Sequence, residues 1–294
     1  MKKNILILGA NGLLGNNLLN YFLLKNFNSK GVVRDQKKIF LKKTNYFFSG
    51  EIIKKNKLNI SSLKKIIKTF RPHYIINCIG ITKRNLMSSK STSLINSILP
   101  KQILKLNNHK NKFKLVHIST DCVYDGNKGN YKETDLANAK DLYGTSKLKG
   151  EPNSPDCIVF RTSMIGHNHD KNNGLLEWFL NQKKEVKGYK NMFFSGPTCI
   201  EIAKIIERFV INKEMIKSGT INLGVKRISK FSLLKKISKI YKKKINIIPS
   251  YNIKIDRSLN IKKFQGITKY NIQNWDKIIL QERKYYKQFK TYNV

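Results

Sequence analysis

A glycine-rich turn near the start of the chain restricts the fold more than any other feature of the sequence. The apolar residues 5–8 have the length of a buried strand, and they run directly into Gly9, Gly12 and Gly15 of the segment GANGLLG. Residues 13–24, which are apolar around most of a helix, follow at once. A strand, a tight turn and a helix in this order are typical of a dinucleotide-binding unit, because the glycines let backbone N–H groups approach a pyrophosphate at the helix N-terminus.

The alternation of strand and helix continues through the first half of the chain. Further strands are predicted at residues 30–33, 74–79, 114–118 and 158–161. An amphipathic helix is predicted at residues 61–70, with Ser61 or Ser62 as its cap. Strands that alternate with helices form right-handed βαβ units. The sequence therefore predicts an α/β protein of the Rossmann type, with a doubly wound parallel sheet that binds ligands at the carboxyl ends of its strands.

The pattern becomes less regular after residue 165. Helices are predicted at residues 177–180, 200–210 and 231–241, and short strands at 220–223 and 245–248. Residues 188–197 are predicted to form a loop over the site. We expect residues 1–165 to form the dinucleotide-binding domain, and residues 166–294 to form a smaller substrate-binding region that lends elements back to the sheet.

The charge of the chain bears on its partners. Lysine and arginine outnumber the acidic residues 58 to 18, which gives a formal net charge of +40. So positive a chain attracts polyanions non-specifically. The lysines are nevertheless spread along the whole sequence, rather than clustered with aromatic residues as in nucleic-acid sites. We therefore expect no specific nucleic-acid partner, and instead a small anionic substrate such as a nucleotide.

The cysteines and the apolar runs indicate a cytoplasmic protein. Cys78, Cys122, Cys157 and Cys199 lack the spacing of metal ligands and are expected to be reduced thiols. The apolar run at residues 5–8 is too short for a signal peptide, and no apolar stretch approaches the ~18 residues that a membrane span requires. No membrane association is expected.

The residue after the second predicted strand bears on the choice of cofactor. Units specific for NAD usually carry Asp or Glu here, which binds the ribose hydroxyls. This chain has Arg34, whose planar guanidinium suits a bidentate grip on a 2′-phosphate. The sequence therefore favours NADPH as the cofactor, while Asp35 beside Arg34 keeps NADH possible.

A hydroxyl, a phenol and an ammonium form the candidate reaction centre. Thr120 follows the strand at residues 114–118, and Tyr143 and Lys147 share one face if they lie on a helix. The Lys147 ammonium, together with the positive nicotinamide of an oxidised cofactor, is expected to lower the pKa of the Tyr143 phenol toward the working pH. Thr120 would orient a substrate carbonyl against Tyr143, and Lys147 would also hold the nicotinamide ribose.

An ordered series of segments resembles a known family. The segments are GANGLLG, INCIGI, STDCVYDG, YKETD, YGTSKLKGE and FRTSMIG, and they span roughly residues 1–170. This series is similar to the extended short-chain dehydrogenase/reductases, and in particular to the dTDP-4-dehydrorhamnose reductase family. The resemblance implies a Rossmann-type fold and NAD(P)H-dependent reduction of the 4-keto group of a nucleotide-activated deoxysugar, with the tyrosine as proton donor, for the synthesis of cell-surface polysaccharide precursors.

The resemblance also implies roles for individual positions of this chain. The positions implied to bind the cofactor pyrophosphate are Gly9, Asn11, Gly12, Leu13 and Gly15. Adenine would contact Asn59 and Ile60, although the family commonly has Asp in place of Asn59. The strand end beneath the cofactor ribose matches Ile79, Gly80 and Ile81. The catalytic positions match Thr120, Tyr143 and Lys147, and Asp121 matches a residue on the substrate side.

Two other functions remain open on the same scaffold. One is 4-epimerisation or sugar-alcohol oxidation of a nucleotide sugar, and an epimerase is disfavoured by Arg34 because it must hold NAD tightly. The other is a non-catalytic regulatory subunit that keeps the fold and the cofactor, since a regulatory subunit of methionine adenosyltransferase resembles this family. Dehydration is disfavoured, because Cys122 stands where the related 4,6-dehydratases have Glu.

The sequence after residue 165 offers fewer signals. Arg257 is a candidate for binding the nucleotide diphosphate of the substrate, or else a surface residue paired with Asp256. His167 and His169 lie near Asp170, but no metal is expected because no scaffold for ligand geometry accompanies them. A homodimer is possible. The sugar, the nucleotide base and the stereochemistry at C4 stay open at this point.

Overall fold

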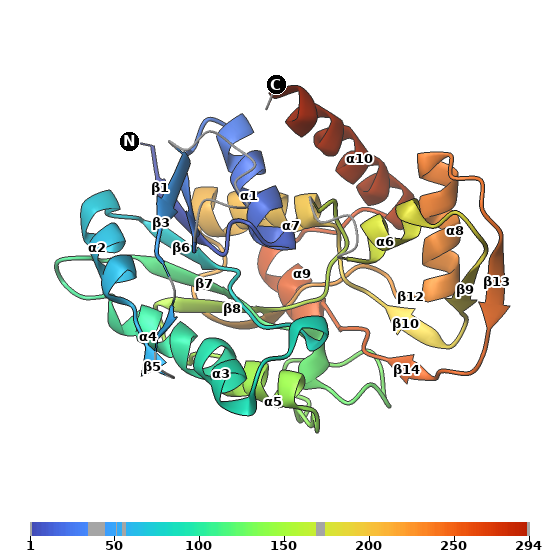
Figure 1. Ribbon diagram of the computed structural model, residues 1–294, viewed down its shortest axis with the longest axis horizontal. Coiled ribbons are helices and arrows are strands. Elements are labelled where there is room, and N and C mark those ends of the chain that lie inside the picture. The colour runs from blue at the N-terminus through green and yellow to red at the C-terminus, as the bar shows by residue number, and fades with distance from the viewer. Residues whose placement is uncertain (1, 35–44, 51, 55–56, 169–173, 293–294) are drawn as a thin grey trace.

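A seven-stranded parallel sheet forms the centre of the protein, whose computed structural model describes residues 2–34, 45–50, 52–54, 57–168 and 174–292 (Figure 1). Its strands are β1 (Asn4–Leu8), β2 (Asn28–Val33), β3 (Tyr46–Phe48), β6 (Tyr74–Asn77), β7 (Lys114–Ile118), β8 (Cys157–Arg161) and β11 (Gly219–Asn222). The spatial order is β11-β8-β7-β6-β1-β2-β3, and every adjacent pair is parallel. The order reverses between β1 and β6, and ligands of such sheets bind outside the strand ends at that point.

Helices cover both faces of the sheet (Figure 1). On one face lie α2 (Ser61–Phe70), α3 (Ser89–Ser93), the π-helical turn η4 (Leu94–Ile98), α4 (Leu99–Lys105) and α5 (Leu142–Lys149). On the other lie α1 (Leu13–Leu24), α7 (Cys199–Ile205) with its continuation η6 (Ile206–Asn212), and α10 (Trp275–Tyr292). The three-layer arrangement confirms the predicted Rossmann-type α/β class.

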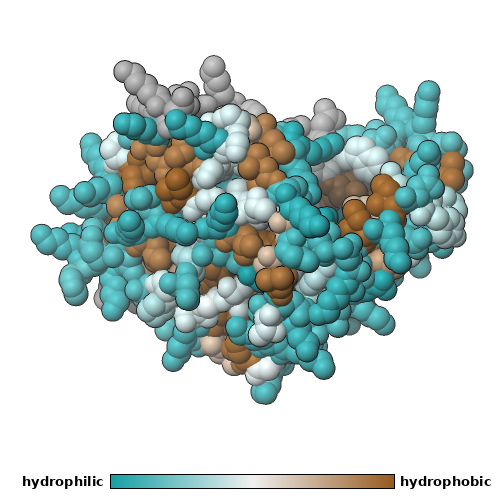
Figure 2. Space-filling model, turned by 90° about the horizontal axis from the view of Figure 1, so that it is seen from below, coloured by the Kyte–Doolittle hydropathy of each residue, from teal (hydrophilic) through white to brown (hydrophobic). Residues whose placement is uncertain are grey.

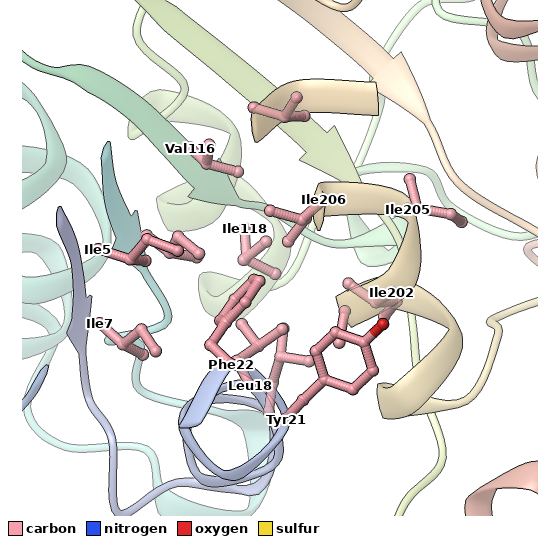
Figure 3. Packing of buried hydrophobic residues seen from close by; sticks show 14 of the residues in the cluster. Ile5, Ile7, Leu18, Tyr21, Phe22, Val116, Ile118, Ile202, Ile205 and Ile206 are labelled. Carbon is pink, nitrogen blue, oxygen red and sulfur yellow. The ribbon is translucent and has the colours of Figure 1, made fainter. Parts of the chain in front are cut away.

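Strand alternation divides the apolar residues between these two layers. In β1, Ile5 and Ile7 face the α1 and α7 side, whereas Leu6 and Leu8 pack with the cluster of the opposite face. Figure 3 shows Phe22 of α1 between the sheet residues and the helix that carries α7 and η6. Because successive strand side chains point to opposite faces, a strand buried on both sides needs the continuous apolar run that the sequence has here.

A second group of elements lies beyond the carboxyl ends of the strands. It contains α6 (Leu175–Asn181), β9 (Val186–Tyr189), β10 (Met192–Phe194), β12 (Ile228–Ser229), α8 (Lys230–Tyr241), β13 (Ile247–Ser250) and β14 (Ile255–Asp256). These strands form two small sheets, β12-β10-β14 and β13-β9. A separate apolar cluster holds the group together, with Phe179, Leu233 and Ile237 among its fully buried members. α9 (Lys262–Thr268) returns toward β11 of the main sheet.

The predicted elements agree with the structure except at two places. Residues 188–197 do not form a loop over the site, because they contain the end of β9 and all of β10, which pair with strands from later in the chain. Helix α2 is not capped by a serine at its start. Instead, the Asn59 side chain accepts hydrogen bonds from the Ser61 N–H at 3.3 Å and the Ser61 hydroxyl at 2.7 Å.

The remaining composition-based expectations concern the cysteines, the membrane and the surface. The four cysteines are free thiols. Among the described residues, no helix combines the length and the apolar character needed to cross a bilayer. Figure 2 shows hydrophilic side chains over most of the face drawn there, with hydrophobic side chains gathered in separate areas between them.

Candidate functional site

The glycine turn places backbone, rather than side chains, at the switch point of the sheet. Gly9 leaves β1 with a left-handed φ of +74° and donates its N–H to the Val32 carbonyl at 3.1 Å. A Cβ on Gly15 would clash with the backbone oxygen of Gly9, so the first turn of α1 lies directly against the strand end. A Cβ on Gly9 would lie 3.1 Å from the Ile79 nitrogen. The turn therefore packs directly against the residues that follow β6.

The N-terminus of α1 has the character of an anion site. Gly12 is its N-cap and is exposed, and no side chain accepts a hydrogen bond there. The first turn contains no acidic residue. The N–H groups at a helix start are unpaired within the helix and carry a partial positive charge, so they suit a phosphate. Asn11 and Leu13 flank Gly12, half-buried, so the five predicted pyrophosphate residues lie together in this turn.

The other predicted cofactor residues lie at neighbouring strand ends. Arg34 directly follows β2 and is exposed, while Asp35 falls outside the described residues. Asn59 and Ile60 are half-buried at the start of α2, where the Asn59 oxygen is already used by Ser61. The residues after β6 lie beside the glycine turn, as the contact of Gly9 with Ile79 shows.

Asn96 joins the strand end after β6 to the helix that carries Tyr143. Its side-chain oxygen accepts from the Ile81 N–H at 2.8 Å, and its nitrogen donates to the Ile81 carbonyl at 3.0 Å and to Ser146 Oγ at 3.0 Å. Asn96 is fully buried in η4. It was not predicted, and the only signal for it in the sequence is an asparagine within an apolar helical stretch.

Thr120, Tyr143 and Lys147 meet at the end of β7. Thr120 caps the 3₁₀ turn η5 (Asp121–Val123), accepting from the Cys122 N–H at 3.1 Å. The Asp141 side chain caps α5 by accepting from the Gly144 N–H at 2.9 Å, which fixes the turn that bears Tyr143. Lys147 is 4% exposed and donates from Nζ to the Ile118 carbonyl at 2.8 Å.

Gly80 lies over the Lys147 ammonium. A Cβ on Gly80 would stand 3.8 Å from Lys147 Nζ and 3.6 Å from the Asn96 side-chain oxygen, and Gly80 itself is exposed. The ammonium therefore lies just beneath an open strand end beside the glycine turn. This arrangement brings the predicted cofactor turn and the predicted catalytic lysine to the same edge of the sheet.

Burial shifts the pKa values of both titratable groups in this centre. Burial raises the pKa of the Tyr143 phenol well above its usual value, and a hydrogen bond with Thr120 lowers it only in part. Burial also lowers the pKa of Lys147 to about 8, although the Glu151 carboxylate opposes that change. The predicted lowering of the phenol pKa concerns Lys147 together with a bound oxidised cofactor, so it stays a prediction; in the structure Lys147 Nζ is bonded to the Ile118 carbonyl and burial dominates the pKa of Tyr143.

A buried ion pair supports the segment around Thr120, just after β7. Glu151 and Arg161 form it at 2.7 Å, and Glu151 also accepts from Ser119 Oγ at 2.6 Å. Arg161 Nη1 donates to the Tyr124 hydroxyl at 2.7 Å. The network holds the residues on either side of Thr120, because Ser119 precedes it and Tyr124 follows η5.

Arg257 lies close to η5 but does not pair with Asp256. Its Nε donates to the Tyr124 carbonyl at 2.9 Å and its Nη2 to the Asp125 carbonyl at 3.0 Å. Asp256 instead pairs with Arg227. Of the two alternatives for Arg257, the surface pair with Asp256 is therefore wrong.

A charged residue that was not predicted also lies near the candidate site. Lys230, the first residue of α8, has its ammonium 3.8 Å from the centre of the Phe194 ring and interacts electrostatically with Asp121 and Cys122. Lys230 was not predicted from the sequence, because one lysine in a lysine-rich chain carries no signal.

His167 does not form a metal site with other described residues. No group of three or more potential metal ligands occurs among the described residues; His169 and Asp170 lie outside them.

Curated relatives match about half of the chain. Methionine adenosyltransferase 2 subunit beta of Danio rerio is 28% identical over 167 residues, which cover 55% of this chain and 48% of the relative. The dTDP-4-dehydrorhamnose reductase of Aggregatibacter actinomycetemcomitans is 29% identical over 167 residues, covering 54% of this chain and 56% of the relative. The chain thus spans about half the length of the curated relatives it matches.

Solved structures match nearly the whole chain. A dTDP-4-dehydrorhamnose reductase from Bacillus anthracis, in complex with NADP, has a TM-score of 0.75 at 21% identity, covering 98% of this chain and 100% of that one. A hypothetical dTDP-4-dehydrorhamnose reductase from Sulfolobus tokodaii has a TM-score of 0.73 at 26% identity, covering 94% and 98%. The first of these likenesses shows the fold alone.

A family model brings these findings together. The model described as the RmlD substrate binding domain matches residues 1–238 of the 294. This match confirms the resemblance seen in the ordered segments of the sequence. By its fold, its glycine turn and this match, the chain belongs to the RmlD substrate-binding-domain family, within the extended short-chain dehydrogenase/reductases.

Proposed function

We propose that this protein uses NADPH to reduce the 4-keto group of a nucleotide-activated deoxysugar, as a step in making polysaccharide precursors. The observation that carries the proposal is the meeting of Thr120, Tyr143 and Lys147 at the end of β7, beside the glycine turn. The dTDP-4-dehydrorhamnose reductases among its relatives and structural neighbours support it. The neighbour from Bacillus anthracis was crystallised with NADP, which supports a nicotinamide cofactor for this chain.

We propose that different parts of the chain bind the cofactor and the substrate. The turn from Gly9 to Gly15 would hold the cofactor diphosphate, and Arg34 would bind a 2′-phosphate, which favours NADPH over NADH. Lys147, just beneath Gly80, would donate to the nicotinamide ribose. Residues 1–165 would thus bind the cofactor and carry the reacting residues, and residues 166–294 would bind the rest of the sugar nucleotide.

The reaction itself needs a hydride and a proton. The nicotinamide, when bound, supplies the hydride to the carbonyl carbon. Tyr143 donates its phenolic proton to the carbonyl oxygen, which becomes the new hydroxyl. The raised pKa keeps the phenol protonated until that moment, and the Thr120 hydrogen bond stabilises the phenolate that is left. Thr120 and Asp121 hold the sugar on the other side of the carbonyl.

Replacement of the proton donor tests this reaction. In Tyr143→Phe, NADPH oxidation with a dTDP-4-keto-6-deoxysugar should fall about 100- to 10,000-fold, the range for losing a general acid, while NADPH binding is kept. NADPH consumption is followed by its absorbance. Tyr251→Phe, at a tyrosine that is 63% exposed, is the matched control and should retain wild-type turnover. Undiminished turnover in Tyr143→Phe contradicts the proposed role.

A non-catalytic regulatory role is the second candidate. It is favoured by the several methionine adenosyltransferase 2 beta subunits among the relatives. The same assay separates the two. Wild-type protein that binds NADPH but turns over no member of a panel of keto and hydroxy nucleotide sugars fits the regulatory role and contradicts the reductase proposal.

A further inference from the structure

Lys230 is a half-buried lysine at the edge of the candidate site. It begins α8, and the Ser229 side chain caps that helix by accepting from the Ser232 N–H at 3.1 Å. Its side chain is partly buried, with Nζ 3.8 Å from the centre of the Phe194 ring. Phe194 belongs to β10, where it pairs with Ile228 of β12. Helix α8 therefore carries this side chain at its first residue, and β10 supplies the ring beside its ammonium.

A continuous set of backbone contacts joins this place to the catalytic turn. The Asp121 N–H donates to the Thr162 carbonyl at 3.3 Å. The next residue, Ser163, lies so close to Gly196 that a Cβ there would clash with its backbone. Gly196 is two residues beyond Phe194. The segment that carries the Phe194 ring therefore packs, through Ser163 and Thr162, against η5, which follows Thr120.

The carboxylate that interacts electrostatically with Lys230 is that of Asp121. Asp121 is 7% exposed, and its charge favours the ammonium form of Lys230. Burial acts in the other direction and lowers the pKa of Lys230 to about 8. No direct ion pair joins Lys230 to Asp121 in the described part of the chain, whose ion pairs lie elsewhere.

An ammonium and a carboxylate that are not in direct contact, such as those of Lys230 and Asp121, can both bind one ligand hydroxyl placed between them. An ammonium only donates hydrogen bonds and a carboxylate only accepts them, whereas a hydroxyl does both. A hydroxyl placed between them accepts from Nζ and donates to the carboxylate, so it satisfies both desolvated charges at once. A phosphate would instead be repelled by the carboxylate, which separates this place from a diphosphate site.

We propose that Lys230 and Asp121 together bind the sugar hydroxyl next to the reacting carbonyl, and so select sugars that carry one. The position follows from the chain, because Asp121 comes directly after Thr120, which orients the carbonyl. In a 4-keto-6-deoxysugar that neighbour is the C3 hydroxyl, since the other neighbour, C5, carries the ring oxygen and the C6 methyl group. This inference rests on the proposed function and adds a specificity residue from the second half of the chain.

Binding of non-reacting nucleotides tests the inference without turnover. Calorimetry on protein saturated with NADP⁺ would compare dTDP, dTDP-glucose and dTDP-3-deoxyglucose. The wild type should bind dTDP-glucose about tenfold more tightly than the 3-deoxy analogue, the range for hydrogen bonds to charged groups. Lys230→Met should remove that preference while dTDP affinity stays at the wild-type value, which also shows that the variant is folded.

A second lysine of the same helix provides the control. Lys235 is exposed on α8 with its ammonium 4.8 Å from the Phe231 ring, and Lys235→Met should keep the tenfold preference. Equal loss of dTDP and dTDP-glucose affinity in Lys230→Met would assign Lys230 to the diphosphate and overturn the inference, as would an unchanged preference. Wild-type protein that binds none of the three nucleotides overturns the proposed function, and this inference with it.

Discussion

The two halves of the molecule prepare for their ligands by different physical means. In the first half, the turn from Gly9 to Gly15 presents backbone N–H groups at the end of a strand, and side chains are absent where the ligand would come. In the second half, the candidate groups for the substrate are long charged side chains, Lys230 at the start of α8 and Arg257 just after β14. A site made of backbone N–H groups depends on the positions of its glycines. A site made of charged side chains depends on how neighbouring elements orient those side chains.

The largest effect is expected from filling the glycine turn. Gly15→Ala would drive a Cβ into the backbone oxygen of Gly9, and overpacking of this kind costs about 3 kcal/mol of unfolding free energy. We expect NADPH affinity to fall at least about tenfold as the turn shifts. Chemical denaturation and a cofactor titration measure the two effects.

A glycine of the second half provides the contrast. Gly266 lies in α9, where a Cβ would meet open space, so Gly266→Ala should stabilise the protein by about 0.5–1 kcal/mol and leave NADPH binding unchanged. An equal loss of NADPH affinity in both variants would contradict the view that the cofactor site depends on the bare backbone of the glycine turn.

The buried lysine of the first half predicts a pH dependence of somewhat smaller size. The pKa of Lys147 is about 8 in the folded protein, below its usual value of 10.5, so between these pH values the unfolded chain binds more protons. Wild-type stability therefore rises with pH through this window relative to Lys147→Met, by about 2–3 kcal/mol. The cost of burying the ammonium is fully present below pH 8 and disappears as the pH approaches 10.5.

Denaturation curves of both proteins at pH 7, 8.5 and 10 check this dependence, since the other groups cancel in the difference. A constant difference across these pH values would mean that the ammonium is solvated, which contradicts its place beneath Gly80.

The smallest effects are expected from the two arginines, one from each half. Arg34→Ala should raise the KM for NADPH about tenfold and leave that for NADH unchanged, because only NADPH carries the 2′-phosphate. Arg257→Ala should raise the KM for the nucleotide sugar only a fewfold, since its Nε and Nη2 are already bonded to backbone carbonyls. Steady-state kinetics with both cofactors measure these values. Equal effects of Arg34→Ala on both cofactors would contradict the phosphate assignment.

Local sequence determined most of the first half. Helices α1 and α2 and strand β7 have the predicted bounds, because their apolar spacing, their glycines and their burial agree. The place of Thr120 at the edge of the sheet follows from the rule that parallel strands end on the same side, and the four-residue spacing of Tyr143 and Lys147 puts both on one face of α5. These features depend on residues that are close together in the sequence, so the sequence alone was enough to predict them.

Tertiary structure alone decided the rest. Residues 188–197 were predicted as a loop because their strand partners, β12, β13 and β14, come from 30 or more residues later in the chain. The pKa values of Tyr143 and Lys147 depend on burial, which spacing does not reveal. Lys230 interacts with the charge of Asp121 only because the second group of elements, which includes α8, lies beyond the carboxyl ends of the strands. Periodicity reports which face of an element is buried, but the meeting of charges from distant segments is a property of the packed chain.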